Sequence, residues 1–423
     1  MACGRFSLLS VIGAIVGVGF AVVGMTGQVI SLNFWLQTFG NGVGGPFTVL
    51  TLIASTVAIG YCILLGAWCV AEGKSLWFAC TPRGVGLLIA CGLAYGCNGV
   101  LMVFATGGTP EMYQAMLLST QMIWTFLFAM LFRLNRGRSY SHAFVLIAFL
   151  LVCGGIVLGM ANAIFDTDGG DAGGNATVTP APSLAANATP APPPPAPETS
   201  AQKMKWTLIF GVSQIPGALF NVLAALFMRA YSVDKRVLND SADIAATHSD
   251  GVTVKLLLLA GSGVAQAIFF WIVYPLDWMP HFGTSDNAAD SIRALRAGYH
   301  CVFFQCPGSF SYFLAFFGCY FMTMIGLALL NAISAPLTAM VSQMAAPLAG
   351  LTLLVIPAWD VTSGSNKNTY EVVGALLLIT AGSLLYVYWE QWMPEHAEER
   401  SLDEGETLNL LKDERAFQHP HLT

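Results

Sequence analysis

The chain has 423 residues, of which 55% are hydrophobic and only 10% are charged, and its formal net charge is −6. Soluble domains carry about a quarter charged residues, and a soluble fold of this length could not hide so much apolar surface. The sequence has no basic patch with interleaved aromatic residues, which argues against nucleic-acid binding. The composition therefore indicates an integral membrane protein whose surroundings are the lipid bilayer.

Ten stretches are long enough to cross a bilayer as helices, a length of about 20 mostly apolar residues. They are Leu8–Asn33, Pro46–Val70, Gly84–Thr106, Glu111–Phe132, Ala143–Ile164, Trp206–Met228, Leu256–Val273, Phe310–Asn331, Pro336–Pro357 and Val372–Trp389. The sequence predicts an all-α membrane fold, because helices satisfy every backbone group in lipid and barrel strands would be short and alternating. The eighth and ninth stretches form one apolar run, which we divide where Pro336 ends or kinks a helix.

A Pro/Ala/Thr-rich loop separates the ten stretches into two groups of five. We expect a first five-helix half at 1–165, an unfolded loop at 166–203, a second half at 204–390 that includes a cysteine-containing loop at 277–309, and an acidic tail at 391–423. The fourth stretch of each half repeats Ala-Met, Ser and Gln-Met, within Ala115–Met122 and Ala339–Met344. Chance could produce this recurrence. The matching position favours two inverted five-helix repeats, an arrangement typical of secondary transporters.

The distribution of cations predicts the orientation. With both termini in the cytosol, 13 of the 18 Lys and Arg residues lie on the cytosolic side, as the positive-inside rule requires. Two glycosylation acceptors, Asn175 and Asn187, then fall on the lumenal side. Cys301 and Cys306 lie there too, where an oxidising environment allows a disulfide; two free thiols are the alternative. The segment Ser291–His300 before them is amphipathic and suited to the membrane surface.

Neutral polar residues within or beside the spans are the candidates for a substrate cavity, because polar groups at membrane depth face a cavity or another helix. The candidates are Gln28, Asn98, Gln114, Ser119, Gln121, Gln214, Asn221, Asn331, Thr338, Ser342 and Gln343. For any one of them, helix–helix packing is the competing interpretation. Glu111 is the candidate for proton coupling, since partial burial would raise its pKa; the alternative is a solvated Glu favoured by a helix N-terminus.

No enzyme is predicted. The sequence has no carboxylate pair, P-loop or metal motif, and none of its seven histidines lies deep in a span, so we expect neither catalytic residues nor a cofactor or metal. Transport of a small-molecule substrate would then be passive or driven by a gradient. A nucleotide-sugar carrier of the secretory pathway is one alternative, although a diphosphate site would want basic residues that the spans lack. A non-transporting membrane receptor or scaffold is another.

Three local stretches carry a resemblance to a known family: Phe104–Met122 with Gln114, Gln214–Pro216 before a basic loop, and Thr338–Pro347. Together with the ten spans and the cysteine-bearing loop, they resemble the chloroquine-resistance-transporter-like family of the drug/metabolite transporter superfamily. The chain departs from that family in having two loop cysteines where apicomplexan members have four, and in having no lysine at Thr26–Gln28. Drug transport is therefore not carried over.

The resemblance implies export of small organic solutes from an acidic organelle, often coupled to protons. Such solutes include amino acids, small peptides, glutathione-like thiols and organic cations. The tail agrees with this location, because Glu406, Leu410 and Leu411 match an acidic dileucine signal that a sorting adaptor would bind. An ordinary solvated tail is the alternative. We expect a vacuolar or lysosomal membrane protein with both termini in the cytosol.

Overall fold

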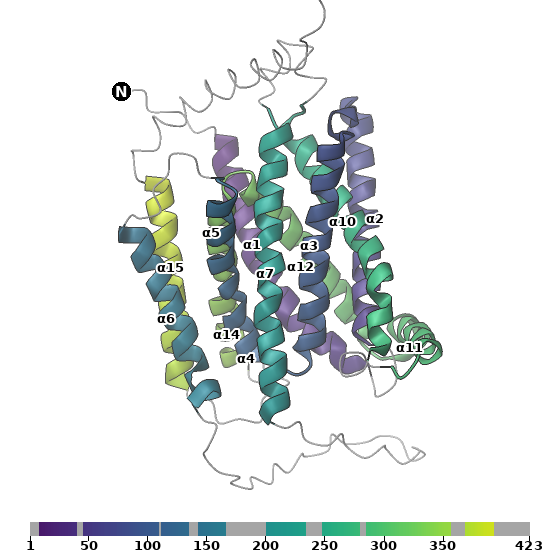
Figure 1. Ribbon diagram of the computed structural model, residues 1–423, viewed down its shortest axis with the longest axis vertical. Coiled ribbons are helices and arrows are strands. Elements are labelled where there is room, and N and C mark those ends of the chain that lie inside the picture. Colours follow the sequence, from purple (N-terminus) through teal and green to yellow (C-terminus); the bar gives the residue numbers. More distant parts are fainter. Residues whose placement is uncertain are drawn as a thin grey trace, which may run out of the picture.

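The computed structural model describes residues 8–39, 45–109, 111–134, 143–165, 200–233, 248–279, 285–356 and 369–392. Within these ranges the regular elements are helices, and the long ones run side by side along the longest axis of the molecule (Figure 1). The α-helices are α1 (Leu8–Thr38), α2 (Pro46–Glu72), α3 (Pro82–Thr106), α4 (Glu111–Leu118), α5 (Thr120–Leu131), α6 (Ala143–Phe165), α7 (Ser200–Tyr231), α10 (Gly251–Val273), α11 (Ala288–His300), α12 (Ser309–Asn331), α13 (Ala335–Gln343), α14 (Ala345–Val355) and α15 (Thr369–Trp392).

The all-α prediction is confirmed for the described residues. Seven of their helices are long and apolar enough to cross a membrane, when Tyr113–Leu131 is counted as one helix across α4 and α5. Ten uninterrupted spans are not observed. The predicted fourth span is broken into α4 and α5, and the predicted ninth into α13 and α14. Other spans are longer than predicted: α1 continues to Thr38, and α7 runs from Ser200 to Tyr231.

Local sequence signals explain where several helices begin and end. Thr81 caps α3 by accepting a hydrogen bond from the Gly84 backbone N–H at 3.0 Å, and Asp250 caps α10 in the same manner through Val252 and Thr253. Gly73 ends α2 with a φ of 61°, a left-handed conformation that glycine adopts without steric cost.

The two broken spans have different local causes for their breaks. Pro347 has no N–H to bond the Gln343 carbonyl four residues earlier, which explains the interruption at Met344. In the fourth span, the Thr120 hydroxyl donates to the Leu117 carbonyl at 2.7 Å, and such side-chain bonds compete with the helical ladder. Both breaks fall within the repeated Ala-Met, Ser, Gln-Met segments.

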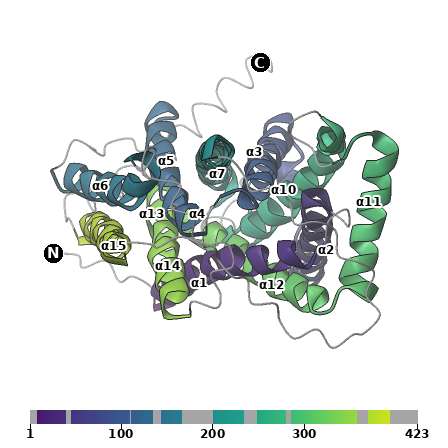
Figure 2. The same ribbon diagram turned by 90° about the horizontal axis from the view of Figure 1, so that it is seen from below.

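Four helix pairs have the most extensive packing: α1 with α12, α3 with α7, α2 with α10, and α6 with α15. The two broken spans also lie against each other, α4 beside α14 and α5 beside α13 (Figure 2). Since α4 precedes α5 and α13 precedes α14, the two broken spans are antiparallel.

Small residues allow the close approach of α1 and α12. A Cβ on Gly24 would lie 2.8 Å from the Cys319 carbonyl oxygen, and one on Gly326 would lie 2.5 Å from the Ala21 nitrogen. Gly155 approaches α15 equally closely, 2.8 Å from the Ala375 oxygen. Such contacts are the usual means of helix association in membranes.

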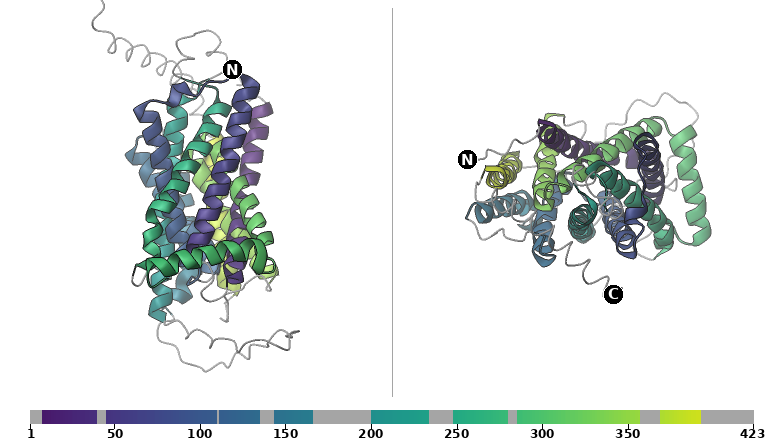
Figure 3. Two further views of the ribbon diagram at one scale, coloured as in Figure 1. Left: turned by 90° about the vertical axis from the view of Figure 1, so that its right-hand side faces the viewer. Right: turned by 90° about the horizontal axis from the view of Figure 1, so that it is seen from above.

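Helix α11 lies across the bundle, roughly perpendicular to the long helices (Figure 3). Its Ser291 is buried and its Ile292 is 60% exposed. The Ser291 hydroxyl donates to the buried carboxylate of Asp277, which also accepts from the Ser285 hydroxyl at 2.7 Å. This arrangement fits the predicted amphipathic surface helix.

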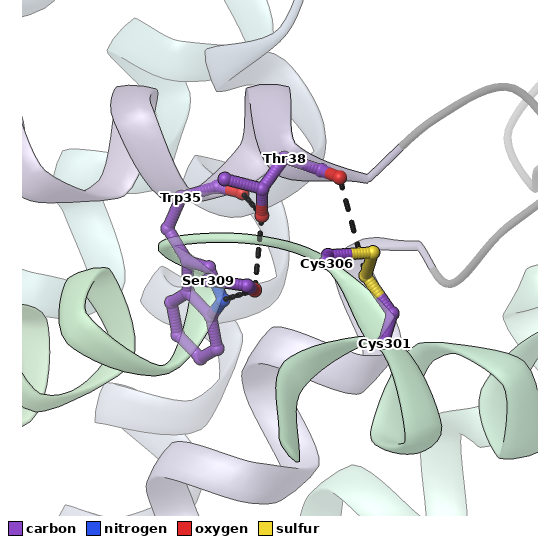
Figure 4. Close-up of a disulfide and its surroundings, with 5 residues drawn as sticks. All are labelled: Trp35, Thr38, Cys301, Cys306 and Ser309. Carbon is purple, nitrogen blue, oxygen red and sulfur yellow. Dashed lines mark hydrogen bonds between the residues drawn. A yellow bond between two sulfur atoms is a disulfide. The ribbon is translucent and has the colours of Figure 1, made fainter. Parts of the chain in front are cut away.

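Cys301 and Cys306 form a disulfide directly after α11 (Figure 4). Beside it, the Ser309 hydroxyl accepts hydrogen bonds from Trp35 Nε1 at 3.2 Å and from Thr38 Oγ1 at 3.0 Å, which join the last turn of α1 to the first residue of α12. We call this end of the bundle the disulfide end, and the other, where α10 begins, the opposite end.

Candidate functional site

A small cavity lies inside the bundle between α1, α2, α3, α10 and α12. It is lined by Gln28, Val49, Leu50, Ile53, Tyr95, Asn98, Gly99, Met102, Val103, Gln266, Phe270, Phe316 and Tyr320. Its volume of 30 Å³ leaves room for about two water molecules. The helices therefore leave little open space around a mostly apolar lining that includes a few polar groups, and a larger solute would require them to separate.

Three amides carry the polarity of this cavity. Gln28 donates from Nε2 to the Thr323 hydroxyl and so joins α1 to α12. Gln266 on α10 accepts from the Tyr320 hydroxyl at 3.0 Å. Because each amide still has unused donor or acceptor capacity, the same groups could hydrogen-bond a solute.

Asn98 on α3 is positioned by an irregularity in α7. Pro216 lies inside α7, and a proline there removes one helical hydrogen bond and disturbs the carbonyls of the preceding turn. Asn98 Nδ2 donates to one of these, the Ser213 carbonyl, at 2.8 Å. The bonded carbonyl is next to that of Val212, the carbonyl four residues before the proline that loses its helical donor.

Aromatic rings form much of the remaining lining. Tyr95 contacts Tyr320 with a ring-centroid distance of 5.9 Å and Phe220 with one of 4.8 Å, while Phe270 and Phe316 line the cavity as well. No lining residue carries a formal charge. Such a surface offers hydrogen bonds and aromatic faces to a neutral or amine-bearing solute, and it offers no cationic side chain to an anion.

The structure buries all eleven predicted cavity residues, but only Gln28 and Asn98 line this cavity. Gln114 instead donates from Nε2 to the carbonyls of Thr106, at 3.0 Å, and Thr109, at 2.7 Å, just where α3 ends. It also exchanges hydrogen bonds of 3.4 Å with Asn33 on α1. Gln114 therefore connects α4 with α1 and with the end of α3.

Asn331 donates from Nδ2 to Asn221 Oδ1 at 3.4 Å, which joins the end of α12 to α7. The other amide atoms of this pair, Asn221 Nδ2 and Asn331 Oδ1, have no hydrogen-bond partner, and the same holds for Ser119 Oγ and Gln343 Oε1. Unpartnered polar atoms at such depth are uncommon and call for an explanation.

The remaining candidates bond mainly within their own helices. The Thr338 hydroxyl donates to the Ser334 carbonyl at 2.9 Å, and the Ser342 hydroxyl to the Thr338 carbonyl at 2.8 Å. Gln214 donates to the neighbouring Ser213 hydroxyl at 2.9 Å. Gln121 lies beside α7, since a Cβ on Gly217 would lie 3.1 Å from its Nε2 atom.

Several predicted residues lie outside what the structure describes. These are Asn175, Asn187, Glu406, Leu410 and Leu411, and the side chain of Glu111, whose backbone begins α4. The sequence interpretation in turn missed Gln266, Tyr95 and Tyr320 in the cavity. Gln266 carried the same signal as the chosen amides, a carboxamide in the middle of an apolar span.

A charged pair also went unnoticed at the opposite end. Lys74 Nζ lies 3.4 Å from Asp250 Oδ2, and Asp250 is almost completely buried. Burial by itself raises the pKa of Asp250, but hydrogen bonds from Thr253 and Val252 together with the charge of Lys74 hold that pKa below its usual value of 3.8. Trp68 Nε1 on α2 also donates to the Thr253 hydroxyl on α10 at 3.1 Å. Together with the Lys74–Asp250 ion pair, this bond joins the end of α2 to the start of α10.

Within the described ranges, His, Cys, Asp and Glu form no group of three that could hold a metal ion. No family model matches the chain, and no curated protein matches it. A solved structure titled "Crystal structure of protein" is similar over 89% of this chain and 99% of its own, with 15% sequence identity and a TM-score of 0.45.

Proposed function

We propose that this protein is a secondary transporter that moves small organic solutes across a membrane. The observation that carries the proposal is the uncharged, largely apolar cavity, with three amides and two tyrosines in its lining, between helices from both halves of the chain, α1 to α3 from the first and α10 and α12 from the second. Seven apolar helices able to span a membrane are compatible with it. Polar side chains are costly at membrane depth and usually mark a solute pathway.

The proposal includes two inverted five-helix repeats, counting α4 with α5 and α13 with α14 as single spans. If each span of the first half is exchanged with the span at the same position in the second half, α1 becomes α7 and α12 becomes α3. The α1/α12 pair then becomes the α3/α7 pair, while the α2/α10 and α6/α15 pairs stay the same. These are the four pairs with the most extensive packing. The antiparallel contact of the two broken spans obeys the same exchange. Such internal symmetry is a property of many carriers.

The lining of the cavity supports neutral, zwitterionic or amine-bearing solutes. Three amides, two tyrosines and further aromatic rings can hydrogen-bond a solute and contact its cationic groups. Amino acids, small peptides and organic cations fit this chemistry. The resemblance to the chloroquine-resistance-transporter-like family adds export from an acidic organelle, where the dileucine pattern would direct the protein.

A flux measurement tests the proposal. The purified protein would be placed in liposomes with an acidic interior, preloaded with pooled labelled amino acids, short peptides and glutathione. We expect protein-dependent export that is saturable and is lowered when Gln266 is replaced by Leu. Folded protein that exports no member of the pool would favour a receptor or scaffold.

Proton coupling is a separate part of the proposal and has its own test. Glu111 begins α4, three residues before Gln114, so its carboxyl is the candidate to change protonation near the solute path. We expect Glu111→Gln to remove the pH dependence of export while export itself continues. The coupling role fails if that variant keeps a wild-type pH dependence.

A further inference from the structure

Two helix pairs in this bundle are joined by extensive packing and by hydrogen bonds. In the α1/α12 pair, backbones approach closely at Gly24, and hydrogen bonds run from Gln28 to Thr323 and from Trp35 to Ser309. These contacts extend over most of the length of the two helices and resist their separation.

The α3/α7 pair is fastened in an equivalent way. Asn98 bonds the Ser213 carbonyl at 2.8 Å, and the hydroxyls of Thr81 and Tyr231 lie 2.9 Å apart at the opposite end. Tyr95 of α3 also contacts Phe220 of α7, with ring centroids 4.8 Å apart. The cavity lies between the α1/α12 pair and α3 of the second pair, and α2 and α10 complete its lining.

Two amide contacts connect these pairs to each other, one toward each end of the bundle. Toward the disulfide end, Asn33 of the α1/α12 pair bonds Gln114, which also bonds the Thr106 carbonyl at the end of α3. Toward the opposite end, Asn331 of the α1/α12 pair bonds Asn221 of the α3/α7 pair. The amide-to-amide bonds are all 3.4 Å long, weaker than typical ones.

The two contacts lie on either side of the cavity. Along α1, Asn33 is five residues beyond the cavity residue Gln28, about 8 Å toward the disulfide end. Along α12, Asn331 is eleven residues beyond the cavity residue Tyr320, about 16 Å toward the opposite end.

We propose that Asn33 with Gln114, and Asn221 with Asn331, are the two gates that alternately admit a solute to the cavity. The proposal rests on the transport function. Separating the α1/α12 pair from the α3/α7 pair at one end breaks that end's amide contact together with packing between the pairs, such as that of α12 on α7. Entering water replaces the lost hydrogen bonds at little net cost. The unpartnered atoms Asn221 Nδ2 and Asn331 Oδ1 gain partners when their gate opens, which favours a reversible closure.

Accessibility of a cysteine in the cavity tests the gates without any substrate. Ile53 lines the cavity and is 4% exposed, so Ile53→Cys should react slowly with a membrane-impermeant maleimide from either side of oriented vesicles. Exposed Cys80 identifies the opposite end, an added Asp286→Cys identifies the disulfide end, and mass spectrometry separates the labelled sites.

Replacing one amide by leucine removes a hydrogen-bond partner from the buried amide that faces it while that gate is closed. Asn331→Leu should raise labelling of the cavity cysteine from the opposite end at least about fivefold. Asn33→Leu should do so from the disulfide end. The reciprocal variant Asn221→Leu should raise labelling from the opposite end, and Gln114→Leu should raise it from the disulfide end. These two variants replace Asn331→Leu and Asn33→Leu in the test if either of those does not fold.

Control variants break hydrogen bonds that lie within one pair. Trp35→Phe removes the bond to Ser309 at the disulfide end, and Tyr231→Phe removes the bond to Thr81 at the opposite end; neither should change the sidedness of labelling. Equal labelling from both sides in the amide variants, or the same sidedness in the controls, would overturn the gates. Sided labelling without any flux would instead leave the gates standing and contradict the proposed transport.

Discussion

Ser119 and Met344 interrupt two neighbouring antiparallel helices with nearly the same backbone geometry. Ser119 has φ −64° and ψ −18°, and Met344 has φ −67° and ψ −15°. Both values lie near those of a 3₁₀-helix, and a short 3₁₀ stretch within a long helix often marks a hinge. The two breaks thus place a matched pair of helix interruptions in adjacent spans of the bundle.

Restoring the helix at Met344 should slow transport. Pro347→Ala gives back the N–H that can bond the Gln343 carbonyl, so we expect higher stability, by less than about 3 kcal/mol, and an export rate at least about fivefold lower if bending is required. Thermal unfolding and flux measure the two effects.

Pro336→Ala is the control, because Pro336 stands in the first turn of α13, where an N–H has no helical partner. An export rate for Pro347→Ala equal to that of the control would contradict a hinge at Met344.

Asp250 should stabilise the protein in a pH-dependent way. Because its folded-state pKa lies below the usual 3.8, its contribution is fully present above that pH and is lost as the pH falls through the lowered pKa. Asp250→Ala should cost about 1–2 kcal/mol at neutral pH through loss of the helix cap.

The measurement is thermal unfolding at pH 7 and at a pH below 3.8. Asp250→Asn keeps a capping oxygen and loses the charge, so it should fall between wild type and Asp250→Ala at pH 7. The difference in unfolding temperature between wild type and Asp250→Asn should be smaller at the acidic pH than at pH 7. An equal difference at both pH values would contradict a stabilising role of the Asp250 charge.

The disulfide should stabilise the loop that carries it. Closing a ring from Cys301 to Cys306, a sequence separation of five residues, contributes about 2 kcal/mol by the chain-entropy relation. We expect Cys301→Ser with Cys306→Ser to lower the unfolding temperature, and reductant to lower it for wild type alone. An unfolding temperature unaffected by reductant in wild type would show that the bond adds no stability.

Tyr320 should contribute to solute binding more than to stability. Tyr320→Phe removes a 3.0 Å hydrogen bond to Gln266 and keeps the ring, so the expected loss of stability is about 1 kcal/mol. Half-saturation of export should shift to higher solute concentration.

Tyr61→Phe serves as the comparison, because its hydroxyl bonds the Phe321 carbonyl at 3.0 Å and Tyr61 does not line the cavity. Equal effects of the two variants on half-saturation would place the solute elsewhere.

The sequence predicted most helices well because a bilayer-spanning helix depends on a long apolar run and on few other features. It misjudged helix ends: the first predicted span ends at Asn33, although α1 continues to Thr38. It also gave no sign of the break at Ser119, since no proline stands in that span and the bend depends on a local threonine bond.

The role of each amide depended on tertiary contacts that periodicity does not report. Gln114 resembled a cavity residue, yet its partners are carbonyls five and eight residues earlier, at the end of α3. Gln266 was overlooked, although it is an amide within a span, and the tyrosines were counted with the apolar residues. Whether a buried polar group binds a solute or another helix is decided by its neighbours in space.

The uncharged lining of the cavity has an electrical consequence. A unit charge that crosses the whole membrane field changes in energy by about 2.3 kcal/mol per 100 mV, but none of the cavity's lining side chains carries such a charge. Reorienting the empty cavity should therefore move almost no charge across the field. Any current that accompanies transport would then count the charge of the solute and of the protons that travel with it.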